Sequence, residues 1–165
     1  MHPRPLLARF LANTTGAALL EFAFVAPVLL WLIMGILEFG LIMHVTSLLQ
    51  YATNEGARQG ITGSAYGGQS REATIRATIT KDLGLWVNTS GQNLTIQAQA
   101  QGDYQTLDGA TPPPASDYGT GGEFVMYKVT LNWRVLTPVM GHLLPAASNG
   151  ILPLQSTALV KNEDF

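Results

Sequence analysis

An α+β fold with one long N-terminal transmembrane helix is the class that the sequence predicts, and three observations support it. Between residues 17 and 43 only Glu21 and Glu38 can carry charge, and this apolar run exceeds the roughly 20 residues that a membrane-spanning helix needs. A helical apolar stripe continues to residue 60, and three segments of alternating apolar residues follow it. We therefore expect a membrane helix that continues into a small head with a second helix and about three antiparallel strands.

Composition excludes several classes of function. The chain has 165 residues, a net charge of −2 and no cysteine, so neither a basic nucleic-acid-binding surface nor thiolate chemistry is available. The three histidines, His2, His44 and His142, are far apart and lack a metal-ligand spacing. We expect no metal site, no cofactor and no nucleic-acid partner.

The first residues predict the orientation of the membrane helix. Residues 1–16 contain Arg4, Arg9 and no acid, which places this end in the cytoplasm and the rest of the chain across the membrane. A cleaved secretory signal also begins with basic residues, but its apolar core is usually about 7–15 residues and ends at a small-x-small site. The apolar segment here is longer and no such site closes it.

Two acids and a proline interrupt the apolar helix. An ionisable residue such as Glu21 inside a membrane helix indicates a function by default, although it could also reach back to the near headgroup layer. Glu38 lies about 25 Å further along the axis and is rotated by roughly 260°, so the two carboxylates cannot form a catalytic pair. Pro27 removes one backbone hydrogen bond, which predicts a kink or a weakened turn near Phe24.

Beyond the membrane, the helical pattern persists in an apolar stripe. Its members are Val45, Leu48, Leu49, Ala52, Gly56 and Ala57. A continuous helix over residues 17–60 would span about 66 Å, more than twice the hydrocarbon thickness, so its outer half should stand above the membrane as the spine of the head. We expect the span itself to end near residue 43.

The head is expected to occupy residues 61–165. Ser70 is a candidate N-cap of a second helix over residues 70–83, with Ile75, Ile79 and Leu83 on one face and Trp86 closing its end. Alternation predicts strands over residues 94–100, 125–135 and 154–160. The Gly- and Pro-rich residues 102–122 predict a flexible loop, and Thr137 with Pro138 predicts a short capped helix over residues 137–144.

Residues around the start of the apolar run resemble the processing site of type IV pilins and pseudopilins. In these proteins a membrane-embedded prepilin peptidase cuts after a glycine and leaves a glutamate as the fifth mature residue. The resemblance implies cleavage between Gly16 and Ala17, which makes residues 1–16 a leader peptide and Glu21 the fifth residue. Phe22 follows, where Tad major pilins typically carry tyrosine. The Glu21 carboxylate of one subunit could pair with the α-amino group of Ala17 of a neighbour.

Further segments resemble the TadE-like family of minor pseudopilins, which belongs to the Tad (Flp-type, tight adherence) pilus systems of bacteria. These segments are Glu21-Phe22-Ala23-Phe24-Val25-Ala26-Pro27-Val28-Leu29-Leu30, Gly35-Ile36-Leu37-Glu38-Phe39-Gly40, Ala52-Thr53-Asn54-Glu55-Gly56-Ala57-Arg58 and the closing Leu159-Val160-Lys161-Asn162-Glu163-Asp164-Phe165. The resemblance implies a non-enzymatic subunit that initiates or supports assembly of an adhesive pilus.

The same resemblance implies partners and a location. We expect membrane lipid, a prepilin peptidase, other pilins or pseudopilins and the inner-membrane assembly platform as partners, with Glu21, Pro27 and Glu38 in subunit packing. The subunit would lie in the bacterial inner membrane, with a cytoplasmic N-terminus and a periplasmic head, and could enter the pilus.

Two other classes remain open from the residues alone. One is an uncleaved single-pass signal-anchor protein with an exported binding domain, in which Glu21 has no special role. The other is an exported enzyme, for which the acids Asp103, Asp108 and Asp117 lack a calcium-loop pattern and favour solvated loop charges.

Overall fold

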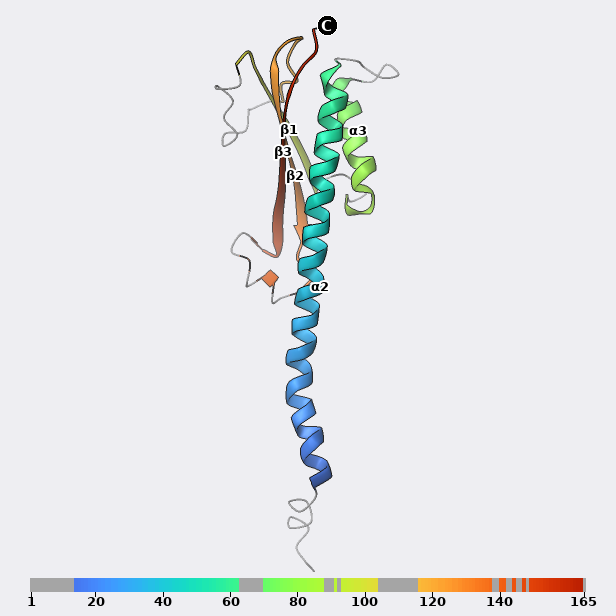
Figure 1. Cartoon of the computed structure of the whole chain (residues 1–165), viewed down its shortest axis with the longest axis vertical. Coiled ribbons are helices and arrows are strands. Elements are labelled where there is room, and N and C mark those ends of the chain that lie inside the picture. Colours follow the sequence, from blue (N-terminus) through green and yellow to red (C-terminus); the bar gives the residue numbers. More distant parts are fainter. Residues whose placement is uncertain are drawn as a thin grey trace, which may run out of the picture.

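A computed structural model shows one long helix with a small head attached beside its upper half (Figure 1). It describes residues 14–62, 70–87, 91, 93–103, 116–137, 140–141, 144, 147 and 149–164. Most of the expected leader, residues 104–115 of the expected loop, and both His2 and His142 lie outside the described residues.

The predicted long helix and second helix are both present. Helix α2 covers Thr14–Ile61 in 48 residues, and helix α3 covers Arg71–Leu83. Ser70 caps α3 as predicted, because its hydroxyl accepts a hydrogen bond from the Ala73 N–H at 3.3 Å. A single 3-10 turn, η2, follows at Gly84–Trp86. Helix α3 runs back along the upper part of α2.

The three predicted strands form one antiparallel sheet in the order β1-β2-β3. Strand β1 is Leu94–Gln101, β2 is Phe124–Arg134 and β3 is Ile151–Lys161, so each agrees with its prediction to within a few residues. Leu94 pairs with Leu131, which pairs with Leu154, and all three leucines are buried. Because this register places apolar residues side by side, the sheet has one continuous apolar face.

Helices α2 and α3 pack against that face and enclose the core of the head. The predicted α2 stripe supplies Val45, Leu49 and Ala52, each fully buried. Trp86 packs on Trp133 with ring centroids 5.4 Å apart, which closes the lower end of α3 as expected. The other face of the sheet is solvated, since every odd-numbered residue of β3 is exposed.

A polar cluster joins the upper ends of four segments. The guanidinium of Arg71 donates to the carbonyls of Gly60 at 2.8 Å and Gly119 at 3.0 Å, and to Oδ1 of Asn162 at 2.6 Å. The Asn162 amide donates in turn to the carbonyls of Tyr118 and Thr120. These bonds connect the end of α2, the start of α3, the loop before β2 and the end of β3. The bond to Gly60 also satisfies a backbone carbonyl in the last turn of α2, where carbonyls lack an intrahelical partner.

Two glycines let α2 approach its neighbours closely. A Cβ atom on Gly56 would lie 2.7 Å from the Ile79 side chain, and one on Gly60 would lie 2.4 Å from the Tyr127 hydroxyl. Neither position has room for a methyl group. The outer half of α2 therefore depends on both glycines for its fit against α3 and β2.

We predict that Gly60→Ala destabilises the head by about 1–3 kcal/mol, because the added methyl group overpacks the site against buried Tyr127. Thermal unfolding of the full chain in detergent, followed by circular dichroism, measures the loss. Gly40→Ala is the matched control: nothing lies within 4 Å of that position, so this change should be neutral or slightly stabilising. Equal effects of the two variants would contradict this account of Gly60.

We also predict that Arg71→Met costs about 2–3 kcal/mol, because it removes three charge-assisted hydrogen bonds and leaves buried Asn162 without its donor. Arg76→Met is the control, since Arg76 lies on the same helix and forms an exposed ion pair with Glu72 at 3.9 Å. That control should change stability by less than about 1 kcal/mol. Similar losses in both variants would show that the Arg71 cluster is not stabilising.

Candidate functional site

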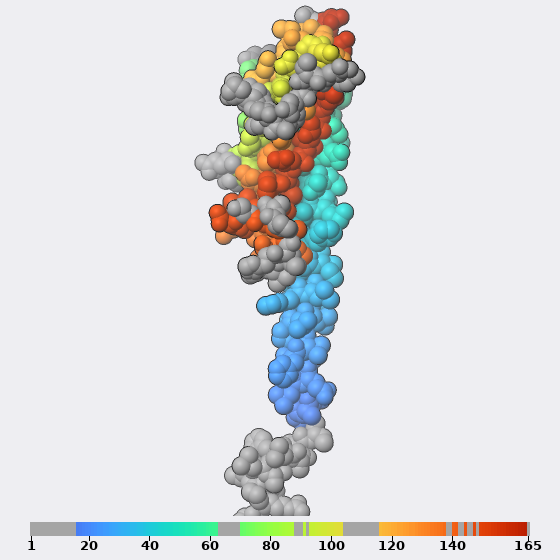
Figure 2. All heavy atoms as spheres, turned by 90° about the vertical axis from the view of Figure 1, so that its left-hand side faces the viewer, coloured from blue at the N-terminus to red at the C-terminus, as the bar shows by residue number. Residues whose placement is uncertain are grey.

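The lower half of α2 is an apolar surface with almost no cover from the rest of the described chain. Figure 2 shows it as a bare column below the head. Its exposed apolar side chains are Leu19, Leu20, Phe22, Phe24, Val25, Val28, Leu29, Leu30, Trp31, Leu32, Ile33, Met34, Ile36 and Leu37. A helix with this composition is stable in lipid or against other apolar helices, and it is unstable in water.

The expected processing residues lie at the start of this column. Gly16 and Ala17 fall in the first described turn of α2. Apart from its own helix, no described residue lies within 4 Å of a Cβ built on Gly16, so a side chain added there does not meet the described part of the head.

Glu21 and Phe22 are both exposed to the surroundings of the helix. Among the described residues, no hydrogen bond or ion pair involves the Glu21 carboxylate. Helix α2 runs through Pro27 without a break. The roles in processing and subunit packing assigned to these residues stay predictions, since a single chain contains none of the partners they would contact.

Glu38 lies in a different environment that the sequence did not indicate. Its side chain is only 2% exposed, and its two carboxylate oxygens accept hydrogen bonds from the backbone N–H groups of Leu136 and Thr137. The Thr137 hydroxyl donates a third bond to the same carboxylate. The carboxylate thus connects α2 to the segment that follows β2. Its predicted role in packing other subunits stays untested, while its contacts within the chain are now defined.

Hydrogen bonds within the segment after β2 hold Thr137 beside that carboxylate. The Gly141 N–H donates to the Thr137 carbonyl at 3.3 Å, and the Met140 N–H donates to the Thr137 hydroxyl at 3.4 Å, so Thr137 is the N-cap that was predicted. Residues 138, 139, 142 and 143 of the short helix predicted over residues 137–144 lie outside the described residues. Its helical residues within the described part are Met140 and Gly141. Met140 extends below Glu38, with its terminal methyl 3.3 Å from a Cβ built on Gly35. We call the described residues Leu136, Thr137, Met140 and Gly141 the base segment.

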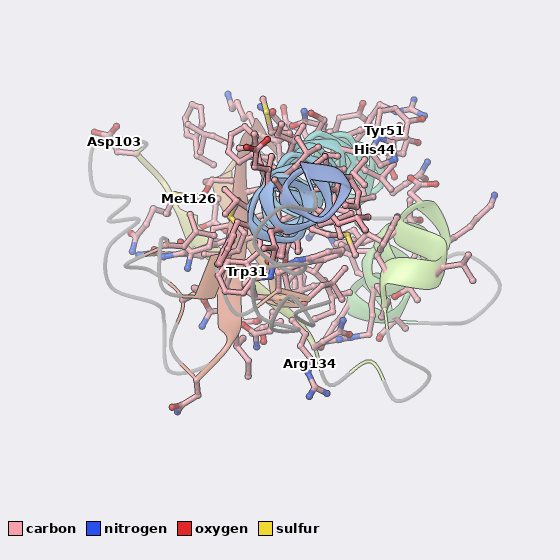
Figure 3. All side chains as sticks on the ribbon, turned by 90° about the horizontal axis from the view of Figure 1, so that it is seen from below. Trp31, His44, Tyr51, Asp103, Met126 and Arg134 are labelled. Carbon is pink, nitrogen blue, oxygen red and sulfur yellow. The ribbon has the colours of Figure 1, made fainter. Side chains whose placement is uncertain are left out.

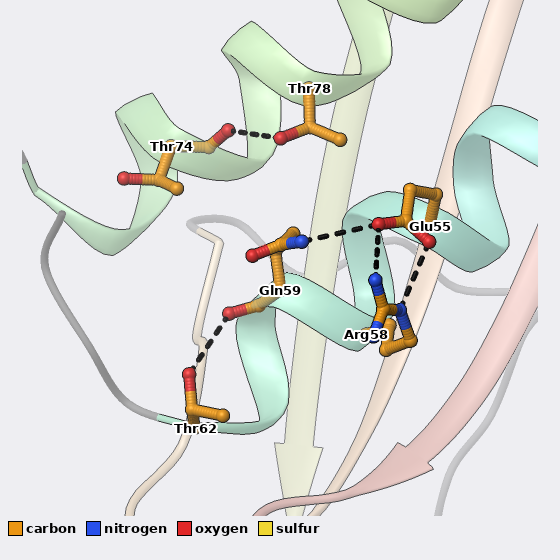
Figure 4. A network of polar contacts seen from close by, with 6 residues as sticks. All are labelled: Glu55, Arg58, Gln59, Thr62, Thr74 and Thr78. Atoms are coloured by element: carbon orange, nitrogen blue, oxygen red, sulfur yellow. Dashed lines mark hydrogen bonds and ion pairs between the residues drawn. The ribbon is translucent and has the colours of Figure 1, made fainter.

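Two further groups of polar side chains could form a site, and each is occupied by bonds within the head. Glu55 accepts hydrogen bonds from Arg58 and Gln59 on the outer turns of α2 (Figure 4), and the bond from Arg58 lowers the pKa of Glu55. The Gly119 and Thr120 N–H groups donate to the carboxylates of Asp117 and Glu123, so these two amides of the glycine-rich turn are already occupied, and by acids that would repel a phosphate. No group of three potential metal ligands occurs among the described residues.

We predict that Glu38→Ala loosens the base segment, because two backbone N–H groups lose their acceptor at a cost of about 1–3 kcal/mol each. Amide hydrogen exchange at Leu136 and Thr137 should accelerate severalfold in the full chain. Glu55→Ala serves as the control, since the partners of that carboxylate among the described residues, Arg58 and Gln59, belong to its own helix. Unchanged exchange at both amides in Glu38→Ala would show that the carboxylate does not hold the segment.

Together these features define a membrane-anchored protein whose single apolar helix carries an α+β head. Of the helices in the described residues, one is long and apolar enough to cross a membrane, and it covers Gly16–Ile61. Residues 16–58 match the family model described as TadE-like protein, which confirms the resemblance over the N-terminal helix. Comparison with curated proteins and with solved structures gave no match.

Proposed function

We propose that the chain is a minor pseudopilin, a structural component of a Tad-type pilus that takes part in its initiation or biogenesis. The observation that carries this proposal is the bare apolar column of α2 with Glu21 five residues after Gly16, inside a segment that matches the TadE-like model. The match starts at Gly16, the residue after which cleavage is expected. The role is structural rather than catalytic, in keeping with the family.

The two halves of α2 suit a subunit that moves between a bilayer and a filament. In the bilayer, lipid covers the exposed apolar side chains of residues 17–37. In a filament, the helices of neighbouring subunits replace that lipid. Glu21 then needs a cation, because a carboxylate that is surrounded by apolar helices is strongly destabilised without a partner. The new α-amino group of Ala17 in a neighbouring subunit supplies this cation after cleavage.

The proposed location follows from the same helix. The N-terminus lies in the cytoplasm, α2 crosses the inner membrane, and the head lies in the periplasm. The prepilin peptidase, other pilins or pseudopilins and the assembly platform are the proposed partners, and each is reached through the membrane-embedded half of α2. The surface of the head contacts the neighbouring subunit in the assembled pilus.

The processing step gives a direct test of the proposal. Wild-type protein purified from its native membrane should have the intact mass of a chain that begins at Ala17, whereas Gly16→Val should retain residue 1, because the β-branched side chain obstructs the scissile peptide bond. Gly40→Val is the control, since it adds the same side chain to an exposed position of the same helix far from the cleavage site.

Absence of cleavage in the wild type would contradict the proposal. If wild type and Gly16→Val both keep residues 1–16, the chain is an uncleaved signal-anchor protein with an exported binding domain. Because Gly16 has no neighbour within 4 Å, a processing defect in the variant cannot be attributed to a misfolded head.

A further inference from the structure

The base segment marks how far down α2 the head reaches. Glu38 binds Leu136 and Thr137, and Met140 contacts the helix at Gly35. From Gly16 to Gly35 the helix rises by about 29 Å, which matches the hydrocarbon core of roughly 30 Å. A span that continued to residue 43 would reach about 40 Å and would bring the base segment and the end of β2 into the hydrocarbon. A span that begins at Gly16 would therefore have its far surface at the level of Glu38.

The side chains at this level are those of an interfacial surface. Leu136 is 66% exposed although it is apolar. Arg134, two residues earlier, is exposed at the end of β2. Seen from below in Figure 3, Trp31 and Arg134 project on the same side of α2. A surface that combines an exposed apolar side chain with a long cationic side chain nearby is most stable at the boundary between acyl chains and headgroups.

A hollow lies directly beneath the base segment. It has a volume of about 470 Å³, is bounded above by Met140, and is lined along α2 by Val28, Trp31, Leu32, Gly35, Ile36 and Phe39. Every lining residue is apolar or glycine. Gly35 deepens the hollow, because a larger residue there would meet Met140. In water this surface would be costly, whereas an acyl chain fits its shape and its chemistry.

We propose that the base segment is a membrane-contacting surface that rests in the outer leaflet, with a phospholipid acyl chain in the hollow beneath Met140 and Arg134 among the headgroup phosphates. The transmembrane span then ends near residue 37 rather than residue 43. The head is held at a fixed height above the bilayer through Glu38. This inference rests on the membrane anchoring of α2, and not on cleavage or on pilus assembly, so either can fail while the other stands.

The absence of cysteine makes single-cysteine labelling straightforward. The full chain is placed in vesicles of phosphatidylethanolamine and phosphatidylglycerol, and a fluorophore attached at Leu136→Cys reports its surroundings. We expect blue-shifted emission and severalfold stronger quenching by spin-labelled lipid than at Leu159→Cys. Leu159 is the matched control, since it is an exposed leucine near the end of β3, and the base segment lies at the opposite end of the sheet, where Ile151 of β3 pairs with Arg134 of β2. Equal quenching at the two positions would overturn the proposal.

The height of the membrane surface has its own test on α2. Leu37 and Met43 are equally exposed, at 59% and 58%, but lie on opposite sides of the proposed boundary. A water-soluble maleimide should modify Met43→Cys severalfold faster than Leu37→Cys, with Tyr51→Cys as the fully aqueous reference. If Met43→Cys is protected as strongly as Leu37→Cys, the span extends to residue 43 and the proposed height is wrong.

The occupant of the hollow is identified with Leu32→Cys. An acyl chain predicts strong quenching of a label there by chain-labelled lipid and no disulfide-linked dimer on oxidation. A second transmembrane helix in the hollow would instead exclude the lipid quencher and allow cross-linking. That result would overturn the lipid assignment.

Discussion

The buried carboxylate of Glu38 sets the geometry on which the rest of the molecule depends. A carboxylate removed from solvent is stable only when donors surround it, and the backbone of Leu136, together with the backbone and hydroxyl of Thr137, provides three. Since these donors lie just after the end of β2, the acid fixes the position of the sheet along α2. The head covers one face of the helix above this residue, and the helix is bare below it, so one hydrogen-bonded carboxylate separates its two environments.

The opposite end of the head is closed by a second polar cluster, and the apolar core lies between the two. Arg71 and Asn162 bring together chain segments that are remote in sequence, while Glu38 does so near the membrane. Apolar packing alone would tolerate small sliding of α2 against the sheet, because it is not directional. Hydrogen bonds at both ends specify a single register, and the close approach of Gly56 to Ile79 leaves little freedom between them.

Local patterns were sufficient to predict the elements but not their connections. The alternation in β2, the N-cap at Ser70 and the apolar stripe of α2 all arise from neighbours in sequence, and each was found from the sequence. Glu38 and Thr137 are 99 residues apart, and Arg71 and Asn162 are 91 apart, so no periodicity indicates that they meet. The opposite holds for Glu21. The motif around it can be recognised in the sequence, but its proposed partner belongs to another molecule.

The order of the strands has a consequence for how the head forms. Among the described elements, strand β3 is the last in sequence, yet it packs on α2, the first, and the Glu163 N–H donates to the Ile61 carbonyl at 3.0 Å. A chain that emerges from the ribosome N-terminus first cannot complete this core until β3 has been made. Helix α2 and the first two strands therefore wait, with their apolar faces uncovered, for a strand that is translated only from Ile151 on, long after the helix ends at Ile61.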